Sequence, residues 1–151
     1  MSGDTDLIKL YSARILELAA DIPHHGRLDD PQASVKRRAP LCGSAVTVDI
    51  SCAEGRVTDY AAEVKACALG QAAASVVGKG IIGCDLEQVS AARDALKDML
   101  KNDGPTPPAP FDGLEVLRPA RDYKNRHASI LLTLEAAAEA MEEARAQAPC
   151  G

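Results

Sequence analysis

The chain has 151 residues, of which 22 are Asp or Glu and 17 are Lys or Arg, so its formal net charge is −5. A single domain of this length can bury about 70% of the surface of the unfolded chain, and we expect one domain over residues 1–151. An acidic domain repels phosphate backbones, and the sequence has no stripe of basic and aromatic residues. Nucleic acid is therefore not an expected partner.

The cysteine content and the first residues bear on where the protein works. Five cysteines are scattered along the chain rather than set in a dense framework. The chain starts with polar and acidic residues instead of the apolar core of a signal peptide, and no apolar run is long enough to cross a bilayer. These features predict a cytoplasmic protein with reduced thiols, in which disulfides are not expected.

The N-terminal half reads as a helix followed by a β-hairpin. Apolar residues recur at three- and four-residue steps over residues 5–20 and predict a helix that ends at Pro23–Gly26. Residues 26–40 are polar and read as a loop that can include a short edge strand. Side chains alternate over residues 43–51 and again over 57–64, with Glu54-Gly55 between them, which predicts an antiparallel hairpin with one buried face.

The C-terminal half reads as helices separated by Gly- and Pro-rich breaks. The predicted elements are a small-residue helix over 68–77, a glycine break over 78–83, a helix over 86–100 capped by Asp85, a proline-rich loop over 104–110, a helical turn around Leu114 and Leu117, and a helix over 123–148 with one apolar face. Strands followed by helices predict an α+β fold in which a small antiparallel β-sheet packs against several α-helices.

Two cysteines and one histidine stand at the ends of these predicted elements. Cys42 precedes the first hairpin strand, Cys67 starts the small-residue helix, and His127 lies at the head of the last helix. Thiolate and imidazole groups are metal donors, and a helix N-terminus lowers the pKa of a thiol. For each cysteine taken alone, the alternative is a buried thiol that packs as a small apolar side chain. Cys52, Cys84 and Cys150 are interpreted as packing or tail residues.

The order of these features resembles the U-type iron–sulfur cluster assembly scaffold family, which includes IscU, the NifU N-terminal domain and SufU. That family carries a PxCGD segment, a later Cys before a small-residue helix, and a His-Cys pair, matched here by Pro40-Leu41-Cys42-Gly43, by Cys67 and by His127. The resemblance runs from about residue 5 to residue 147. It implies that Cys42, Cys67 and His127 bind an iron–sulfur cluster transiently, or iron or zinc, in a scaffold or carrier that works with a cysteine desulfurase and acceptor apo-proteins.

Two positions depart from the family pattern. Ser44 stands where the family has Asp, and Ala128 stands where it has the Cys after the His. An assembling [2Fe–2S] cluster uses four protein donors, whereas two Cys and one His with an open position suit Zn²⁺. The alternative hypothesis is therefore a degenerate homologue that binds zinc or no metal and modulates a cysteine desulfurase through its surface.

Further patterns bear on partners and activity. The Leu-Pro-Pro-Val-Lys segment that the resemblance links to an Hsp70-type chaperone is absent, because residues 117–121 read Leu-Arg-Pro-Ala-Arg. A basic and apolar patch of Arg38, Leu41, Lys124 and Arg126 is expected to favour an acidic partner. Residues 78–83 match GxGxxG but follow a predicted helix, so nucleotide binding is not expected. No nucleophile–base pair is readable, and we expect no enzyme activity.

Overall fold

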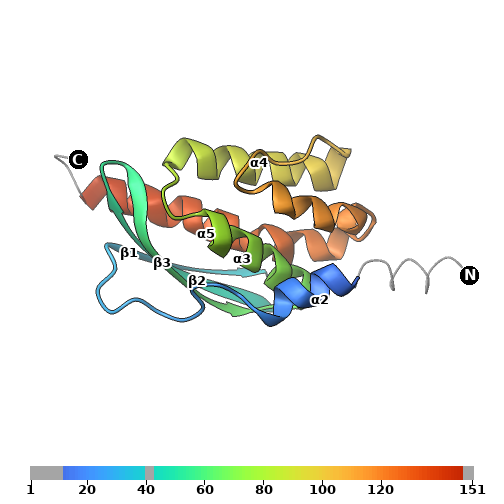
Figure 1. Ribbon diagram of the computed structural model, residues 1–151, viewed down its shortest axis with the longest axis horizontal. Coiled ribbons are helices and arrows are strands. Elements are labelled where there is room, and N and C mark those ends of the chain that lie inside the picture. The colour runs from blue at the N-terminus through green and yellow to red at the C-terminus, as the bar shows by residue number, and fades with distance from the viewer. Residues whose placement is uncertain (1–11, 40–42, 148–151) are drawn as a thin grey trace, which may run out of the picture.

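The computed structural model describes residues 12–39 and 43–147, which form a three-stranded antiparallel sheet packed against helices (Figure 1). This is the predicted α+β fold. Helix α2 spans Ala13–Ala20, and the Ser12 hydroxyl caps its N-terminus by accepting a hydrogen bond from the Ile15 amide. Ile15 and Leu18 are the buried residues of this helix. The earlier part of the helix predicted over residues 5–20 lies outside the described residues.

The sheet has the order β1-β2-β3, with β1 spanning Ala33–Ala39, β2 spanning Ser44–Ala53 and β3 spanning Arg56–Lys65. Both neighbouring pairs are antiparallel, and Val48 at the centre of β2 pairs with Val35 on one side and Ala62 on the other. The predicted hairpin is confirmed as β2 and β3, with Glu54-Gly55 at its turn. The edge strand suggested within residues 26–40 is β1, a full seven-residue strand.

A β-bulge explains an irregular spacing in the sequence of the hairpin. The register shifts between Ser51 and Cys52, so that Ser51 pairs with Asp59 but Cys52 pairs with Val57. The extra residue between them reverses the alternation of inward and outward side chains. As a result Val57 and Tyr60, three positions apart, are both buried.

Helix α3 spans Ala68–Gly80 and therefore runs through the first three residues of the predicted glycine break. The two glycines at the end of this helix are required by close neighbours. A Cβ atom at Gly78 would lie 2.7 Å from the Pro23 carbonyl oxygen, and one at Gly80 would lie 2.8 Å from the Pro110 Cβ. These glycines let the end of α3 approach other backbone segments, and the helix ends only at Ile81. The GxGxxG pattern thus belongs to a helix end.

The next helix, α4, spans Leu86–Asn102 and begins with a capping box. The Asp85 carboxylate accepts from the Gln88 amide, and the Gln88 side chain accepts from the Asp85 amide, which satisfies two N–H groups that the helix leaves unpaired. The predicted cap at Asp85 is confirmed. A 3₁₀ helix, η1, spans Asp112–Asp122 and is longer than the single helical turn predicted around Leu114 and Leu117.

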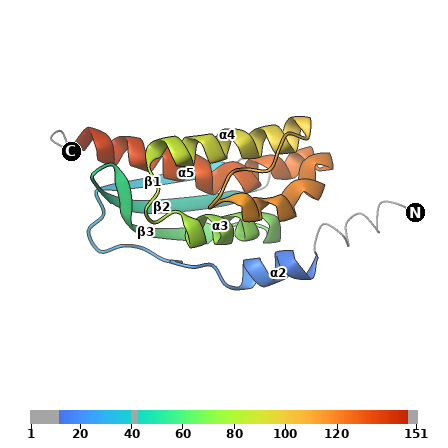
Figure 2. The ribbon, with the colours of Figure 1, turned by 45° about the horizontal axis from the view of Figure 1, so that its top comes forward.

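The last helix, α5, spans Lys124–Gln147 and lies at the centre of the fold (Figure 2). One side packs against β1 and β2, another against α3, and a third against α4, while α2 packs on the far side of α3. Ala136, Ala138 and Ala140 are buried in addition to the single apolar face predicted from the sequence. The prediction of one apolar face was too narrow because short alanine side chains let neighbouring elements approach the helix from several sides.

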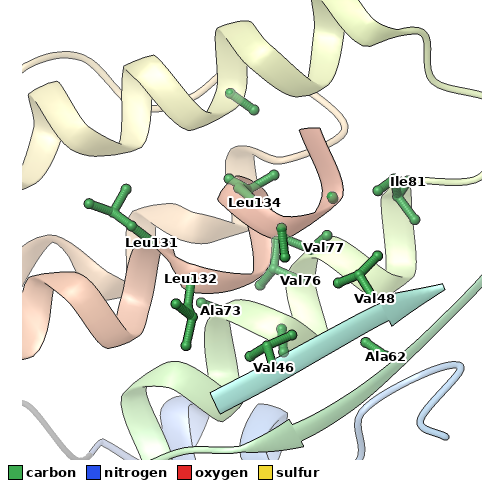
Figure 3. Packing of buried hydrophobic residues seen from close by; sticks show 14 of the residues in the cluster. Val46, Val48, Ala62, Ala73, Val76, Val77, Ile81, Leu131, Leu132 and Leu134 are labelled. Carbon is green, nitrogen blue, oxygen red and sulfur yellow. The ribbon is translucent and has the colours of Figure 1, made fainter. Parts of the chain in front are cut away.

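Aliphatic and alanine side chains form the core between α5, α3 and the sheet. Figure 3 shows Leu132 of α5 beside Val46 of β2 and Ala73 of α3, and it also labels Leu134 of α5 and Val77 of α3. All five are buried and belong to one contiguous cluster. None of the helices in the described ranges combines the length and apolarity needed to cross a membrane.

Candidate metal centre

The start of β2, the end of β3 and the beginnings of α3 and α5 meet at one end of the sheet. The pairing of Ala45 with Lys65 places the start of β2 beside the end of β3. Two residues after β3, Cys67 is the N-cap of α3. Ser129, in the second turn of α5, lies 3.7 Å from the Cys67 Sγ through its hydroxyl oxygen. The fold therefore brings residues 44, 67 and 129 together from three separate elements.

The Cys67 thiol is half-buried, and its surroundings favour the thiolate. Burial is the largest single influence and raises the pKa, but the backbone amides of Gly70 and Leu69, the Ser129 hydroxyl and the positive charge of Arg126 together outweigh it. The pKa of Cys67 is therefore lowered from its ordinary value. Unpaired amides at a helix N-terminus stabilise a thiolate, and the thiolate is the form that binds metal. The lowered pKa predicted from the position at a helix start is present.

Behind Cys67, the hydroxyls of Ser44 and Ser129 share a buried hydrogen bond of 2.9 Å. The two serines are 3% and 1% exposed, so this bond is out of reach of solvent. Gly70 leaves room for the Ser129 hydroxyl, because a Cβ at this position would lie 2.6 Å from the Ser129 Oγ. Sequence reasoning missed Ser129, although a small polar residue on the inward side of a helix was the available signal.

The His127 side chain is buried and bonded to the backbone of η1. Its Nε2 lies 3.0 Å from the Ala120 carbonyl oxygen and 3.1 Å from that of Arg121. Both partners can only accept, so Nε2 carries the hydrogen and the lone pair is on Nδ1. Ala128, the next residue, is exposed and lines a groove together with α4 residues. On α5, the residue whose hydroxyl lies beside the Cys67 thiol is Ser129.

Two of the three predicted ligands, Cys67 and His127, lie within the described residues. Cys67 lies at the end of the sheet described above, and His127 is in the first turn of α5, while Cys42 lies outside the described residues. Over residues 12–39 and 43–147, no group of three or more His, Cys, Asp or Glu side chains is arranged to hold a metal ion. The ligand set of Cys42, Cys67 and His127 therefore stays a prediction.

The remaining predicted features are surface cations near this end and packing cysteines at the opposite end of the sheet. Arg38 and Lys124 are exposed and Arg126 is half-buried, whereas Leu41 lies outside the described residues. Burial raises the pKa of the Cys52 and Cys84 thiols. Both pack against the core, as predicted, so the electrostatic setting of Cys67 differs from that of either.

The protein thus belongs to the class of small α+β domains, with a cysteine at a helix N-terminus whose surroundings favour the thiolate. More specifically, residues 10–129 match the family described as NifU-like N terminal domain, and the chain belongs to that family. It is similar to a solved structure described as a nitrogen-fixing NifU-like protein (N-terminal) from Brucella abortus. The identity is 44% and the TM-score 0.91, over 94% of this chain and 99% of that one.

The sequence is also similar to two proteins named iron-sulfur cluster assembly scaffold protein IscU. The one from Streptococcus pyogenes serotype M1 is 27% identical over 61% of this chain, and the one from Thermotoga maritima is 28% identical over 62% of it. These matches span 57% and 66% of the lengths of the two relatives, respectively. The predicted resemblance to U-type scaffolds is confirmed at the level of the family.

Proposed function

We propose that this protein is an iron–sulfur cluster assembly scaffold or carrier, in which Cys67, together with Cys42 and His127, holds a cluster or its iron as cargo. The observation that carries the proposal is the lowered pKa of Cys67 at the N-terminus of α3. Membership of the NifU-like N terminal domain family and the similarity to two IscU scaffold proteins support an iron–sulfur cluster as the cargo that this thiolate binds. Such a protein holds and transfers its cargo, and it needs no enzyme activity.

The donors available to that cargo differ in kind. Cys67 supplies a thiolate, the donor that iron–sulfur clusters use most. His127, in the tautomer set by its two carbonyl partners, has only Nδ1 available for a metal. Ser44 and Ser129 contribute hydroxyls that stay protonated near neutral pH, so we assign them to positioning Cys67 rather than to binding the cargo.

Anaerobic reconstitution with iron, sulfide and reductant tests the proposal. The wild-type protein is expected to gain visible absorption and bound iron, and Cys67→Ser should lose both. Cys52→Ser is the matched control, because Cys52 is also half-buried but has a raised pKa. Equal loading of the three proteins would overturn the assignment of Cys67. Zinc bound in place of iron, lost in Cys67→Ser, would instead support the zinc-binding alternative.

We propose a cysteine desulfurase as the sulfur donor and apo-proteins as the acceptors of the finished cluster. The exposed cations Arg38 and Lys124 and the half-buried Arg126 lie on a protein whose formal net charge is −5, which favours oriented approach of an acidic partner. Titration with a purified desulfurase should reveal salt-sensitive binding, weakened several-fold by Arg126→Glu but not by Lys36→Glu on β1. Absence of binding at low salt would remove this partner.

A further inference from the structure

A basic groove lies between α4, η1 and the first turns of α5. Its cavity has a volume of about 570 Å³, and four cationic side chains surround it: Lys97 and Lys101 of α4, Arg121 of η1 and Lys124 of α5. Glu135 is the one carboxylate among the described residues that line this cavity. The groove is therefore strongly positive on a protein that is acidic as a whole.

Most of this positive charge is not balanced within the described part of the chain. Lys97, Lys101 and Lys124 are exposed and form no ion pair there, whereas Arg121 pairs with Asp103 at 2.6 Å. The Glu135 carboxylate oxygen lies 3.9 Å from Nε of Arg37 on β1, so Glu135 is partly neutralised by Arg37 rather than by the lysines. The N-terminus of α5 adds a partial positive charge beside Lys124. An anionic group entering the groove would thus meet three lysines that have no ion-pair partner among the described residues.

The floor of the groove is apolar and continues beyond the basic end. Leu100 and Leu131 line it, with 2% and 6% of their surface exposed. A second cavity of about 370 Å³ shares Lys97, Leu131 and Glu135 with the first, so the two cavities adjoin along α4 and α5. This second part is lined by four carboxylates and three cations, among which Arg37 pairs with Glu139 at 2.8 Å and Arg93 with Asp94 at 3.1 Å.

From these features we infer that the groove binds an acidic segment of a partner protein, with one apolar side chain of that segment placed on Leu100 and Leu131. Carboxylates at one end of the segment would meet Lys97, Lys101 and Lys124. A compact anion such as phosphate would leave the apolar floor uncovered, and two adjoining cavities suit an extended chain better than a point charge. This goes beyond the proposed scaffold function and needs no bound metal.

The groove lies next to one of the proposed metal ligands. His127 and Ala128 line the same groove. A segment bound there would lie against the residue proposed to bind metal through Nδ1, on the side of α5 away from the Cys67–Ser129 contact. A bound partner segment would therefore restrict access to His127.

The test uses a fluorescein-labelled synthetic peptide in which glutamates flank one leucine, titrated with metal-free protein at low salt. Wild-type protein should bind it, and Lys97→Glu with Lys101→Glu should weaken binding by about tenfold, because two attractions become repulsions. The control is Lys36→Glu with Lys79→Glu, which makes the same change in net charge at exposed sites outside the groove. It should change the affinity by less than about twofold.

Two further arms separate the inference from simpler explanations. A peptide with serine in place of the leucine should bind several-fold more weakly, and inorganic phosphate at equal concentration should not displace the original peptide. Absence of peptide binding, equal losses in both double variants, or equal binding of the serine peptide would each overturn the inference. Metal-free protein that binds the peptide but fails reconstitution would sink the scaffold proposal alone, so the two can fail separately.

Discussion

The hydroxyl of Ser129 lies between the Ser44 hydroxyl, at 2.9 Å, and the Cys67 thiol, at 3.7 Å. Residue 129 is therefore a position on α5 from which a side chain reaches Cys67. The Cys that follows the His in the family pattern corresponds to position 128. Here that residue is Ala128, which is exposed and lines the basic groove.

This geometry predicts different effects of two cysteine substitutions. Ser129→Cys would place a second thiol beside Cys67, so we expect it to raise the yield of [2Fe–2S] cluster over wild type on anaerobic reconstitution. Ala128→Cys would place its thiol in the groove and should raise the yield less. Absorption per bound iron measures the difference. A higher yield with Ala128→Cys would contradict this prediction.

Gly70 provides a second prediction, on stability. A Cβ at this position would lie 2.6 Å from the Ser129 Oγ and 2.8 Å from the Ala66 Cβ. We expect Gly70→Ala to lower the free energy of unfolding by about 2 kcal/mol in spite of the better helix propensity of alanine. Gly113→Ala is the matched control, because its nearest neighbour would be the Val76 side chain at 3.3 Å. Urea unfolding of both variants gives the comparison, and equal stabilities would contradict the close packing at Gly70.

The buried Asp49 predicts a pH dependence of stability. Its carboxylate accepts hydrogen bonds from Arg27 at 2.7 Å, from the Ser34 hydroxyl and from the Leu28 amide. Burial, the largest influence, raises the pKa, but these bonds outweigh it and lower the pKa of Asp49 from its ordinary value. The stabilisation is therefore complete above the pKa of the unfolded chain, about 3.9, and is lost as the pH falls through the lower pKa of the folded protein.

Asp49→Asn should accordingly cost about 2 kcal/mol at neutral pH, and the difference from wild type should shrink as the pH falls below about 4. Urea unfolding at a series of pH values measures both quantities. Asp94→Asn, at an exposed carboxylate paired with Arg93, should behave like wild type throughout. A difference that stays constant with pH would contradict the assigned role of the ionised carboxylate.

Tyr60 carries a buried hydroxyl that has no hydrogen-bond partner within the described residues. Burial raises the pKa of Tyr60 well above its ordinary range, so the group is neutral at all physiological pH values. Removing an unsatisfied buried oxygen should stabilise the fold, and we expect Tyr60→Phe to raise the free energy of unfolding by about 1 kcal/mol. A lower thermal midpoint for this variant than for wild type would mean that the hydroxyl has a partner in solution.

The sequence predicted the elements better than it predicted their contacts. The hairpin, the Asp85 cap and the long last helix follow from alternation, capping residues and apolar periodicity, all of which are local. Local patterns could not reveal that Gly78 and Gly80 belong to α3, because the Pro23 and Pro110 neighbours that require them are distant in the chain.

At the candidate centre, the sequence predicted Cys67 at a helix start but not Ser129 as its neighbour. That contact depends on the angle at which α5 crosses β2 and α3, a tertiary property that periodicity does not contain. The basic groove was missed for the same reason. Lys97 and Lys101 lie more than 20 positions before Lys124, and only the packing of α4 on α5 brings them to one surface.

The edge strand β1 has a consequence for self-association. Among the described residues, its side opposite β2 pairs with no other strand, and an open strand edge is a template for adding another chain. Lys36, Arg37 and Arg38 occupy the middle of β1, and all three are exposed. A second copy approaching edge to edge would set these cations against their own counterparts. The same short run of charges therefore guards the protein against aggregating through its sheet.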